Sequence, residues 1–406
     1  MDPPPALIID KALQAVAALS LDAQASRTPS LGTSKAIDTT ATMSTTTRFG
    51  QLAAELHIAI AQRCNGEQLL ALRQVCRNLA KDTTDVFARH FFTYVSCDID
   101  GESLQRLCDL SAVGYLARHI RTLSLSVRGV ADFVYHASEV VLLAQSMKAL
   151  TKLGAAKELH VEACPWLTRR AMKTLAPPPT DLTFNIDIVH EAMISSSFVP
   201  SKFRYESPMP LDLPQSSLNP QAVDQLCQIW AHLEHVQFSI DSGDWATAPN
   251  FPKLLQSATK LRTLGIFGYN SRGALDIFSW LRTSTLRSLS LSQDTLCSQE
   301  LCDILTRFAS SLKRLELVCI DLVEENGWLK VLEHIRDHMH LDHLSVRSVK
   351  SGLDDVLMHF GIAFRTEFTI QGRPLEMRVQ LDALLEQPRF GDEDHATITT
   401  DDRFNF

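Results

Sequence analysis

Apolar residues recur at helical spacing between residues 48 and 92. The first set comprises Leu52, Leu56 and Ile60, and the second comprises Leu69, Leu72, Cys76 and Leu79. Steps of three and four residues place each set along one face of an amphipathic helix. Asn65-Gly66 separates the two sets and marks a turn, and residues 81–92 continue as a third helix whose end is rich in phenylalanine. The pattern predicts a short all-α module over residues 48–92.

A second pattern, in which a strand is followed by a helix, recurs from residue 93 to residue 390. The motif Leu-x-x-Leu-x-Leu, or a close variant, starts at Leu233, Leu261, Leu286, Leu312 and Leu341. These starts lie 28, 25, 26 and 29 residues apart, and helix-like stretches follow at residues 274–281, 298–308 and 328–338. A period of roughly 20–29 residues is typical of leucine-rich repeats.

Weaker signals extend the array in both directions. The additional candidates are copies at Ile120 and Ala156, strands at residues 182–184, 203–205 and 367–370, and a capping helix at residues 375–385. Five prolines between residues 200 and 220 predict an irregular loop that interrupts the repeat there. The array is therefore expected to span most of the chain.

The repeat predicts an α/β fold, because a single unit cannot bury its apolar side alone. Stacked units form a solenoid with parallel strands on the concave side and helices on the convex side. The motif leucines then point inward, and the residues between them point out along the concave face. The candidates for contact with a target protein are His235, Gln237, Phe267, Tyr269, Ser290, Ser292, Arg314, Glu316 and Arg347. Phe267 and Tyr269 beside small serines form a possible hot spot, although an ordinary solvated strand face has the same pattern.

Composition narrows the class of protein and of partner. With 406 residues, 45% hydrophobic and 21% charged, the chain is expected to be globular and large enough for more than one domain. The net charge of -8 argues against nucleic acid or an anionic membrane surface as the main partner. The sequence contains no run of about 18 apolar residues, so a membrane-spanning helix is not expected.

The nine cysteines and the two ends of the chain indicate the compartment. The cysteines are scattered, without a Cys-x-x-Cys pair, so reduced thiols in the cytoplasm and/or nucleus are expected. Residues 1–47 are rich in Ser and Thr, which favours a disordered leader and not a secretory signal. Residues 391–406 are expected to form an acidic tail.

The sequence carries no recognised catalytic motif. It lacks a glycine-rich phosphate loop, a His-Glu-x-x-His zinc motif and a Gly-x-Ser-x-Gly nucleophile elbow. His338, His340 and His343 lie close together but lack cysteine or carboxylate partners at ligand spacing. A chain without enzymatic activity, metal or cofactor is therefore expected.

The helical module resembles an F-box. The family pattern opens with Leu-Pro-x-Glu-Leu and closes, after a leucine-rich second helix, in Val-Cys-Arg. The matching residues here are Leu52-Ala53-Ala54-Glu55-Leu56, Ile60, Leu69, Leu70, Leu72 and Val75-Cys76-Arg77. Ala53 stands where the family usually has proline, and Leu79 stands where many members have tryptophan. The stretch up to Val95 looks most like the F-box proteins of filamentous fungi.

The resemblance implies a role in ubiquitin transfer. An F-box docks on the Skp-type adaptor of an SCF complex, a cullin-RING ubiquitin ligase, and the following repeats hold the target protein. The residues expected to face the adaptor are Leu52, Ala53, Leu56, Ile60, Leu70, Leu72, Val75 and Cys76. Catalysis would then consist of proximity and would require no active site in this chain.

Three alternatives remain open from the sequence alone. The helical module can be a plain hairpin that caps the repeats, since amphipathic stripes are usually core. The chain can be a leucine-rich-repeat scaffold outside a ubiquitin ligase, an alternative favoured by Ala53 in the proline position. An enzyme with an unrecognised site is the third, which the missing motifs disfavour.

Overall fold

A computed structural model provides the fold over most of the chain. It describes residues 52–127, 137–163, 186–210, 218–241, 250–269, 273–292, 295–324, 327–347, 350–351 and 367–385. The predicted leader at residues 1–47, the strand at residues 182–184 and the tail at residues 391–406 lie outside these ranges.

The described part of the chain begins with a group of short helices. They are α2 (Ala54–Ala61), α3 (Gly66–Val75), α4 (Arg77–Asp82) and α5 (Thr84–Phe92). Asn65 begins α3 with a capping box, in which its side chain accepts from the Gln68 amide at 2.9 Å and the Gln68 side chain accepts in return. The turn at Asn65-Gly66 is confirmed. The predicted third helix differs, because Thr83 has a non-helical ψ of 4° and divides it into α4 and α5.

The repeats form one sheet of ten strands in chain order. Its strands are β1 (Tyr94–Asp98), β2 (Thr122–Val127), β3 (Glu158–Ala163), β4 (Lys202–Pro210), β5 (His235–Asp241), β6 (Thr263–Tyr269), β7 (Ser288–Ser292), β9 (Arg314–Val318), β11 (His343–Arg347) and β13 (Glu367–Gln371). All neighbouring strands are parallel except β13, which pairs antiparallel with β11. The predicted last strand at residues 367–370 is confirmed, and its antiparallel direction could not be predicted, because apolar alternation has the same period in both directions.

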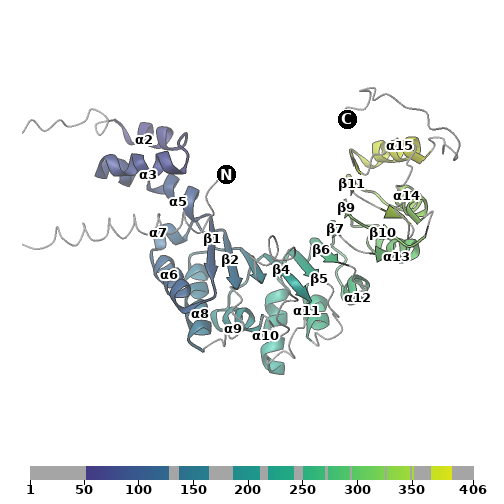
Figure 1. Ribbon diagram of the computed structural model, residues 1–406, viewed down its shortest axis with the longest axis horizontal. Helices are drawn as coiled ribbons and strands as arrows, with labels where there is room; N and C mark the ends of the chain where they lie inside the picture. Colours follow the sequence, from purple (N-terminus) through teal and green to yellow (C-terminus); the bar gives the residue numbers. More distant parts are fainter. Residues whose placement is uncertain are drawn as a thin grey trace, which may run out of the picture.

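Helices cover the convex side of this sheet. They are α6 (Gly101–Ala112), α7 (Gly114–Ala117), α8 (Ala137–Lys152), α9 (Asp187–Ser196), α10 (Pro220–Trp230), α11 (Phe251–Ser257), α12 (Gly273–Trp280), α13 (Ser298–Phe308), α14 (Gly327–His338) and α15 (Pro374–Leu385). Figure 1 shows an open arc with strands along its inner side, helices along its outer side, α2 to α5 at one end and α15 at the other. The solenoid-like α/β architecture is confirmed. A small parallel sheet of β8 (Thr295–Leu296), β10 (Asp321–Leu322) and β12 (Lys350–Ser351) lies among the last repeats.

The region rich in proline differs in its first half from the predicted loop, and the strand predicted at residues 203–205 is confirmed there. Strand β4 occupies its first half, because Phe203 and Tyr205 alternate with polar residues and are both 2% exposed in the core. The pairing of β4 with β5 becomes irregular only between Ser207 and Pro210. Pro220 begins α10, where a proline has no amide hydrogen to leave unpaired. Residues 211–217 lie outside the described ranges.

The core runs without interruption through the array. The leucines that start the five clear motifs are 0–2% exposed, as the repeat predicts. Trp230 packs against the rings of Phe203, Phe238 and Phe251. Phe87 and Phe92 of α5 belong to the same cluster of buried residues as the repeats. The helical end and the first repeat therefore share one core.

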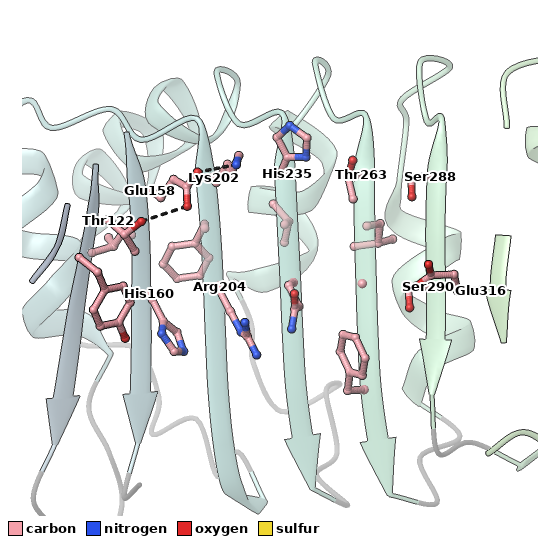
Figure 2. Close-up of a pocket in the computed structure, with 18 residues that line it drawn as sticks. Thr122, Glu158, His160, Lys202, Arg204, His235, Thr263, Ser288, Ser290 and Glu316 are labelled. Carbon is pink, nitrogen blue, oxygen red and sulfur yellow. Dashed lines mark hydrogen bonds and ion pairs between the residues drawn. The ribbon is translucent and has the colours of Figure 1, made fainter. Parts of the chain in front are cut away.

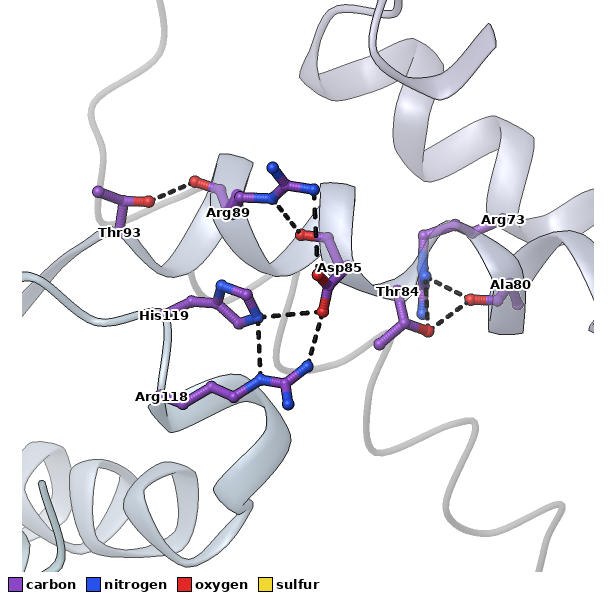
Figure 3. A network of polar contacts seen from close by, with 8 residues as sticks. All are labelled: Arg73, Ala80, Thr84, Asp85, Arg89, Thr93, Arg118 and His119. Atoms are coloured by element: carbon purple, nitrogen blue, oxygen red, sulfur yellow. Dashed lines mark hydrogen bonds and ion pairs between the residues drawn. The ribbon is translucent and has the colours of Figure 1, made fainter. Parts of the chain in front are cut away.

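A polar network reinforces this junction (Figure 3). Arg118 donates to the Asp85 carboxylate of α5 at 2.7 Å, and His119 lies 3.3 Å from the same carboxylate oxygen. Arg73 of α3 donates to the Ala80 carbonyl at 2.6 Å and lies 4.2 Å from the centre of the Phe87 ring. The exposed ion pairs contribute little stability by themselves, but with the shared core they fix the orientation of α5 on the array.

Helix α9 carries a buried titratable pair. His190 and Asp187 are 6% and 5% exposed, and α9 packs against both α8 and α10. Burial lowers the pKa of His190 to about 4, against the opposing attraction of Asp187. The folded chain therefore holds His190 neutral over a range of pH in which the unfolded chain protonates it.

Acid should destabilise the protein through His190. An unfolded histidine takes up a proton near pH 6.5, whereas His190 in the folded chain does so near pH 4. The stability is therefore complete above about pH 6.5 and falls between pH 6.5 and 4, by up to about 3 kcal/mol. Urea unfolding across this range should show a shallower dependence for His190→Gln than for the native chain. Parallel profiles for the two proteins would contradict the assignment.

Candidate binding surfaces

The short helices at the start of the described chain expose apolar side chains. Leu56 on α2 and Val75 on α3 are 50% and 53% exposed, and Ala53 is exposed as well. The other residues expected to face an adaptor are half-buried: Leu52, Ile60, Leu70, Leu72 and Cys76. The buried apolar positions of these helices include Ala61, Leu69 and Leu79. The structure thus separates the predicted stripes into an inner and an outer set.

A polar residue that the sequence reasoning missed takes an inner position of α2. His57 is 1% exposed, and its Nδ1 lies 2.8 Å from a carboxylate oxygen of Asp82 on α4. Because His57 follows Leu56 directly, the two side chains point about 100° apart on the helix. The partners are 25 residues apart in the chain, so no local pattern could reveal them. Burying His57 turns Leu56 toward solvent.

Ala53 has the backbone conformation of a proline. It is the N-cap of α2 with φ −62° and ψ 147°, and its carbonyl accepts from the amides of Leu56 and His57 at 3.0 and 3.2 Å. Proline fixes φ near −65°. The backbone at Ala53 therefore has a conformation that proline can also adopt.

The second surface is a hollow of about 500 Å³ on the inner face of the sheet. Parallel pairing without offset brings the outward residues of successive strands into rows across the face (Figure 2). One row contains Thr122, Glu158, Lys202, His235, Thr263 and Ser288. The next row contains His160, Arg204, Gln237, Gly265, Ser290 and Glu316.

The hollow brings together several of the predicted target-binding residues. Those that line it are His235, Gln237, Phe267, Ser290 and Glu316. Arg314 is exposed and lies 3.1 Å from Glu316, and Arg347 is exposed at the end of β11. The side chain of Tyr269 lies outside the described part of the structure.

Ser292, also predicted to contact a target, is only 6% exposed. Ser292 pairs in register with Phe267 on one side and Val318 on the other. A small side chain between two larger ones is covered by them, so it offers little surface for contact. The alternation of apolar and polar residues predicts the direction in which a side chain points. It does not predict how far the neighbouring side chains extend over it.

The sequence reasoning missed the other half of the lining. These residues lie on the first four strands: Tyr94, Thr122, Glu158, His160, Lys202 and Arg204. Apart from Tyr94, which precedes the first predicted copy, they occupy the same outward positions as the predicted set, but in the weaker repeat copies. The sequence signal that could have found them is the position that follows each inward-pointing residue of the weaker copies. The same position supplied the predicted residues in the clear copies.

The charges on this half are matched internally. Lys202 forms an ion pair with Glu158, which also accepts from the Thr122 hydroxyl at 3.1 Å. Arg204 pairs with Glu206. A hydrogen bond from His160 lowers the pKa of Glu206. The first strands of the hollow therefore present fixed, compensated charges.

The centre of the hollow is uncharged, and its floor lacks a side chain. Burial and the nearby Lys202 lower the pKa of His235, which keeps it neutral at pH 7. Gly265 forms the floor, since a Cβ there would meet the Phe267 ring at 3.0 Å and the Gln237 side chain at 3.2 Å. The centre of the hollow thus combines small hydroxyls with one aromatic ring over a glycine.

The described part of the chain shows two further absences. No group of three or more His, Cys, Asp or Glu stands there in a position to hold a metal ion. No described helix is long and apolar enough to cross a membrane. His338 stacks on His334 at 4.6 Å, and His343 lies 3.8 Å from Glu316.

Comparison with known proteins adds no relative to these observations, because no family model and no curated protein matches the chain.

The exposed and buried leucines of the helical end should differ in their effect on stability. Leu69→Ala removes a side chain with 0% exposure, which should lower the free energy of unfolding by about 2–5 kcal/mol. Leu56→Ala should cost less than about 1 kcal/mol, because half of that side chain is already in water. Urea unfolding followed by circular dichroism measures both. Equal losses would show that Leu56 is a core residue.

Proposed function

We propose that this chain is the substrate-recognition subunit of an SCF-type, cullin-RING E3 ubiquitin ligase. The helices α2 to α5 would dock on the Skp-type adaptor as an F-box, and the leucine-rich-repeat-like array would bind the target protein. The observation that carries the proposal is the outward placement of Leu56 and Val75, which lie in the matching F-box pattern and are about half exposed.

Physical reasoning supports adaptor docking at these helices. Apolar surface gains roughly 25 cal/mol per Å² when a partner removes it from water. The inner positions of the helices are already satisfied by Leu69, Leu79 and the His57–Asp82 pair. The outer apolar side chains are therefore available to a partner without loss of the fold.

The junction supports a mechanism based on proximity. The core shared by α5 and the first repeat, together with the Asp85 network, holds the concave face at a fixed orientation to the docking helices. A target bound on that face would stay near the conjugating enzyme, which raises the effective concentration of its lysines. This function requires no catalytic group in the chain.

A scaffold outside a ubiquitin ligase is the second candidate. Ala53 in place of the family's proline favours it, since a drifted F-box can lose its adaptor while the repeats still bind proteins. The two candidates differ in adaptor binding and not in target binding.

A pull-down with purified Skp-type adaptor tests the proposal. We expect the native chain to bind and Leu56→Asp and Val75→Asp each to reduce binding at least about tenfold, because a carboxylate buried at an interface without a partner costs several kcal/mol. Val141→Asp is the matched control, since Val141 is 52% exposed on α8. Circular dichroism checks that each variant folds. Absence of binding by the native chain would favour the scaffold.

Ala53→Pro separates the two candidates further. The φ of −62° accommodates proline, so the substitution should stabilise the chain by about 0.4–1 kcal/mol. In a working F-box we expect the adaptor affinity to be maintained or increased. A stabilised variant that still fails to bind the adaptor would indicate the scaffold.

A further inference from the structure

Three basic residues occupy equivalent positions immediately before successive strands. Arg262 precedes β6, Arg287 precedes β7 and Lys313 precedes β9. The Arg287 amide donates to the Arg262 carbonyl at 2.7 Å, and the Lys313 amide donates to the Arg287 carbonyl at 2.8 Å. The three residues are thus spaced one strand apart, about 4.8 Å. We call Arg262, Arg287 and Lys313 the basic row.

Arg287, the middle residue of the basic row, has a basic residue on each side. Arg262 and Arg287 are exposed, and neither forms an ion pair with any residue that the structure describes. Lys313 donates to the His340 carbonyl at 3.0 Å, which orients its ammonium group but leaves its charge. The cations on the concave face itself, such as Lys202 and Arg204, have carboxylate partners.

Like charges meet at the middle of the basic row, where Arg287 lies between Arg262 and Lys313. Like charges on adjacent strands repel each other. The chain as a whole is acidic, with a net charge of -8, so the row does not result from a general excess of basic residues. An anionic partner would relieve this repulsion. The row therefore has the properties of a contact site more than those of a structural element.

Carboxylates limit the row at both ends. The Arg262 amide donates to the Glu234 carbonyl, and the Asp342 amide donates to the Lys313 carbonyl, so Glu234 and Asp342 occupy the next positions of the same row. A longer run of negative charge would meet these side chains and be repelled. The row matches a short acidic cluster.

The basic row adjoins the hollow. Thr263 and Ser288 follow Arg262 and Arg287 in the chain and line the hollow, where Phe267 stands over the Gly265 floor. A target segment that runs from the basic row into the hollow would place its carboxylates at the row. An apolar side chain further along the segment would lie against Phe267.

We propose that the concave face recognises a target segment with a short cluster of aspartate or glutamate beside an apolar residue. This inference names the class of target for the proposed receptor and rests on that function for its biological role. The short cluster would contact the basic row, and the apolar residue would pack on Phe267. The ligand expected from this arrangement is a polypeptide and not a long polyanion, because the carboxylates of Glu234 and Asp342 flank the row and would repel further negative charge.

Fluorescence anisotropy with the full chain tests the inference. The probe is a labelled synthetic peptide with three consecutive glutamates and a nearby leucine, and its matched form has glutamine in place of glutamate. We expect the glutamate peptide to bind about tenfold or more tightly than the glutamine peptide at low salt, and less so at high salt. Equal affinity of the two peptides would overturn the proposal.

Variants assign the binding to the row. Arg287→Glu should weaken the glutamate peptide about tenfold or more, and its melting temperature should be unchanged or higher, since glutamate between Arg262 and Lys313 is attracted to both. Lys148→Glu, on the exposed surface of α8, is the matched control and should leave affinity unchanged. Unchanged affinity in Arg287→Glu, or tighter binding of a single-stranded oligonucleotide than of the peptide, would overturn the assignment.

The same proteins separate this inference from the proposed function. Arg287→Glu should bind the Skp-type adaptor as the native chain does, because the row lies on the repeats. If the native chain binds the glutamate peptide and not the adaptor, the ligase role fails and the acidic specificity stands. If it binds the adaptor and not the peptide, the ligase role stands and the acidic specificity fails.

Discussion

The packing of each repeat against the next is the interaction on which the whole structure depends. The motif leucines are removed from water only because a neighbouring repeat covers them. Their burial aligns the strands in parallel and without offset over most of the sheet. That alignment converts residues far apart in the chain into rows across one face. The hollow and the basic row are both consequences of it.

The rows differ in how their charges are satisfied. On the first strands Glu158, Lys202, Arg204 and Glu206 neutralise one another, so this part of the face is already ordered before a partner arrives. The centre is uncharged, and its floor at Gly265 lacks a side chain. The basic row lies beside it, and in its middle Arg287 stands between two other basic residues. Charges are thus paired on the first strands of the sheet, whereas like charges meet in the middle of the basic row.

The helical end follows a different principle. Its inner positions include a polar pair, His57 and Asp82, and its large apolar side chains at Leu56 and Val75 remain in water. A module this small buries little surface alone. It is held instead by the phenylalanines of α5 in the core of the repeats. Stability comes from the array, and the outer apolar surface of the helices stays exposed.

The sequence by itself determined the elements with a local period. The repeat leucines, the helices between them, the turn at Asn65 and the outward direction of His235 or Gln237 all follow from spacing within a few residues. Only the tertiary structure decided the direction of β13, the extension of the strand at residues 203–205 to Pro210, the burial of Ser292 and the inward placement of His57. The alignment of Arg262, Arg287 and Lys313 belongs to the same group. Each depends on contacts between residues about 25 or more apart, whose meeting is set by the packing of whole repeats and leaves no trace in a local pattern.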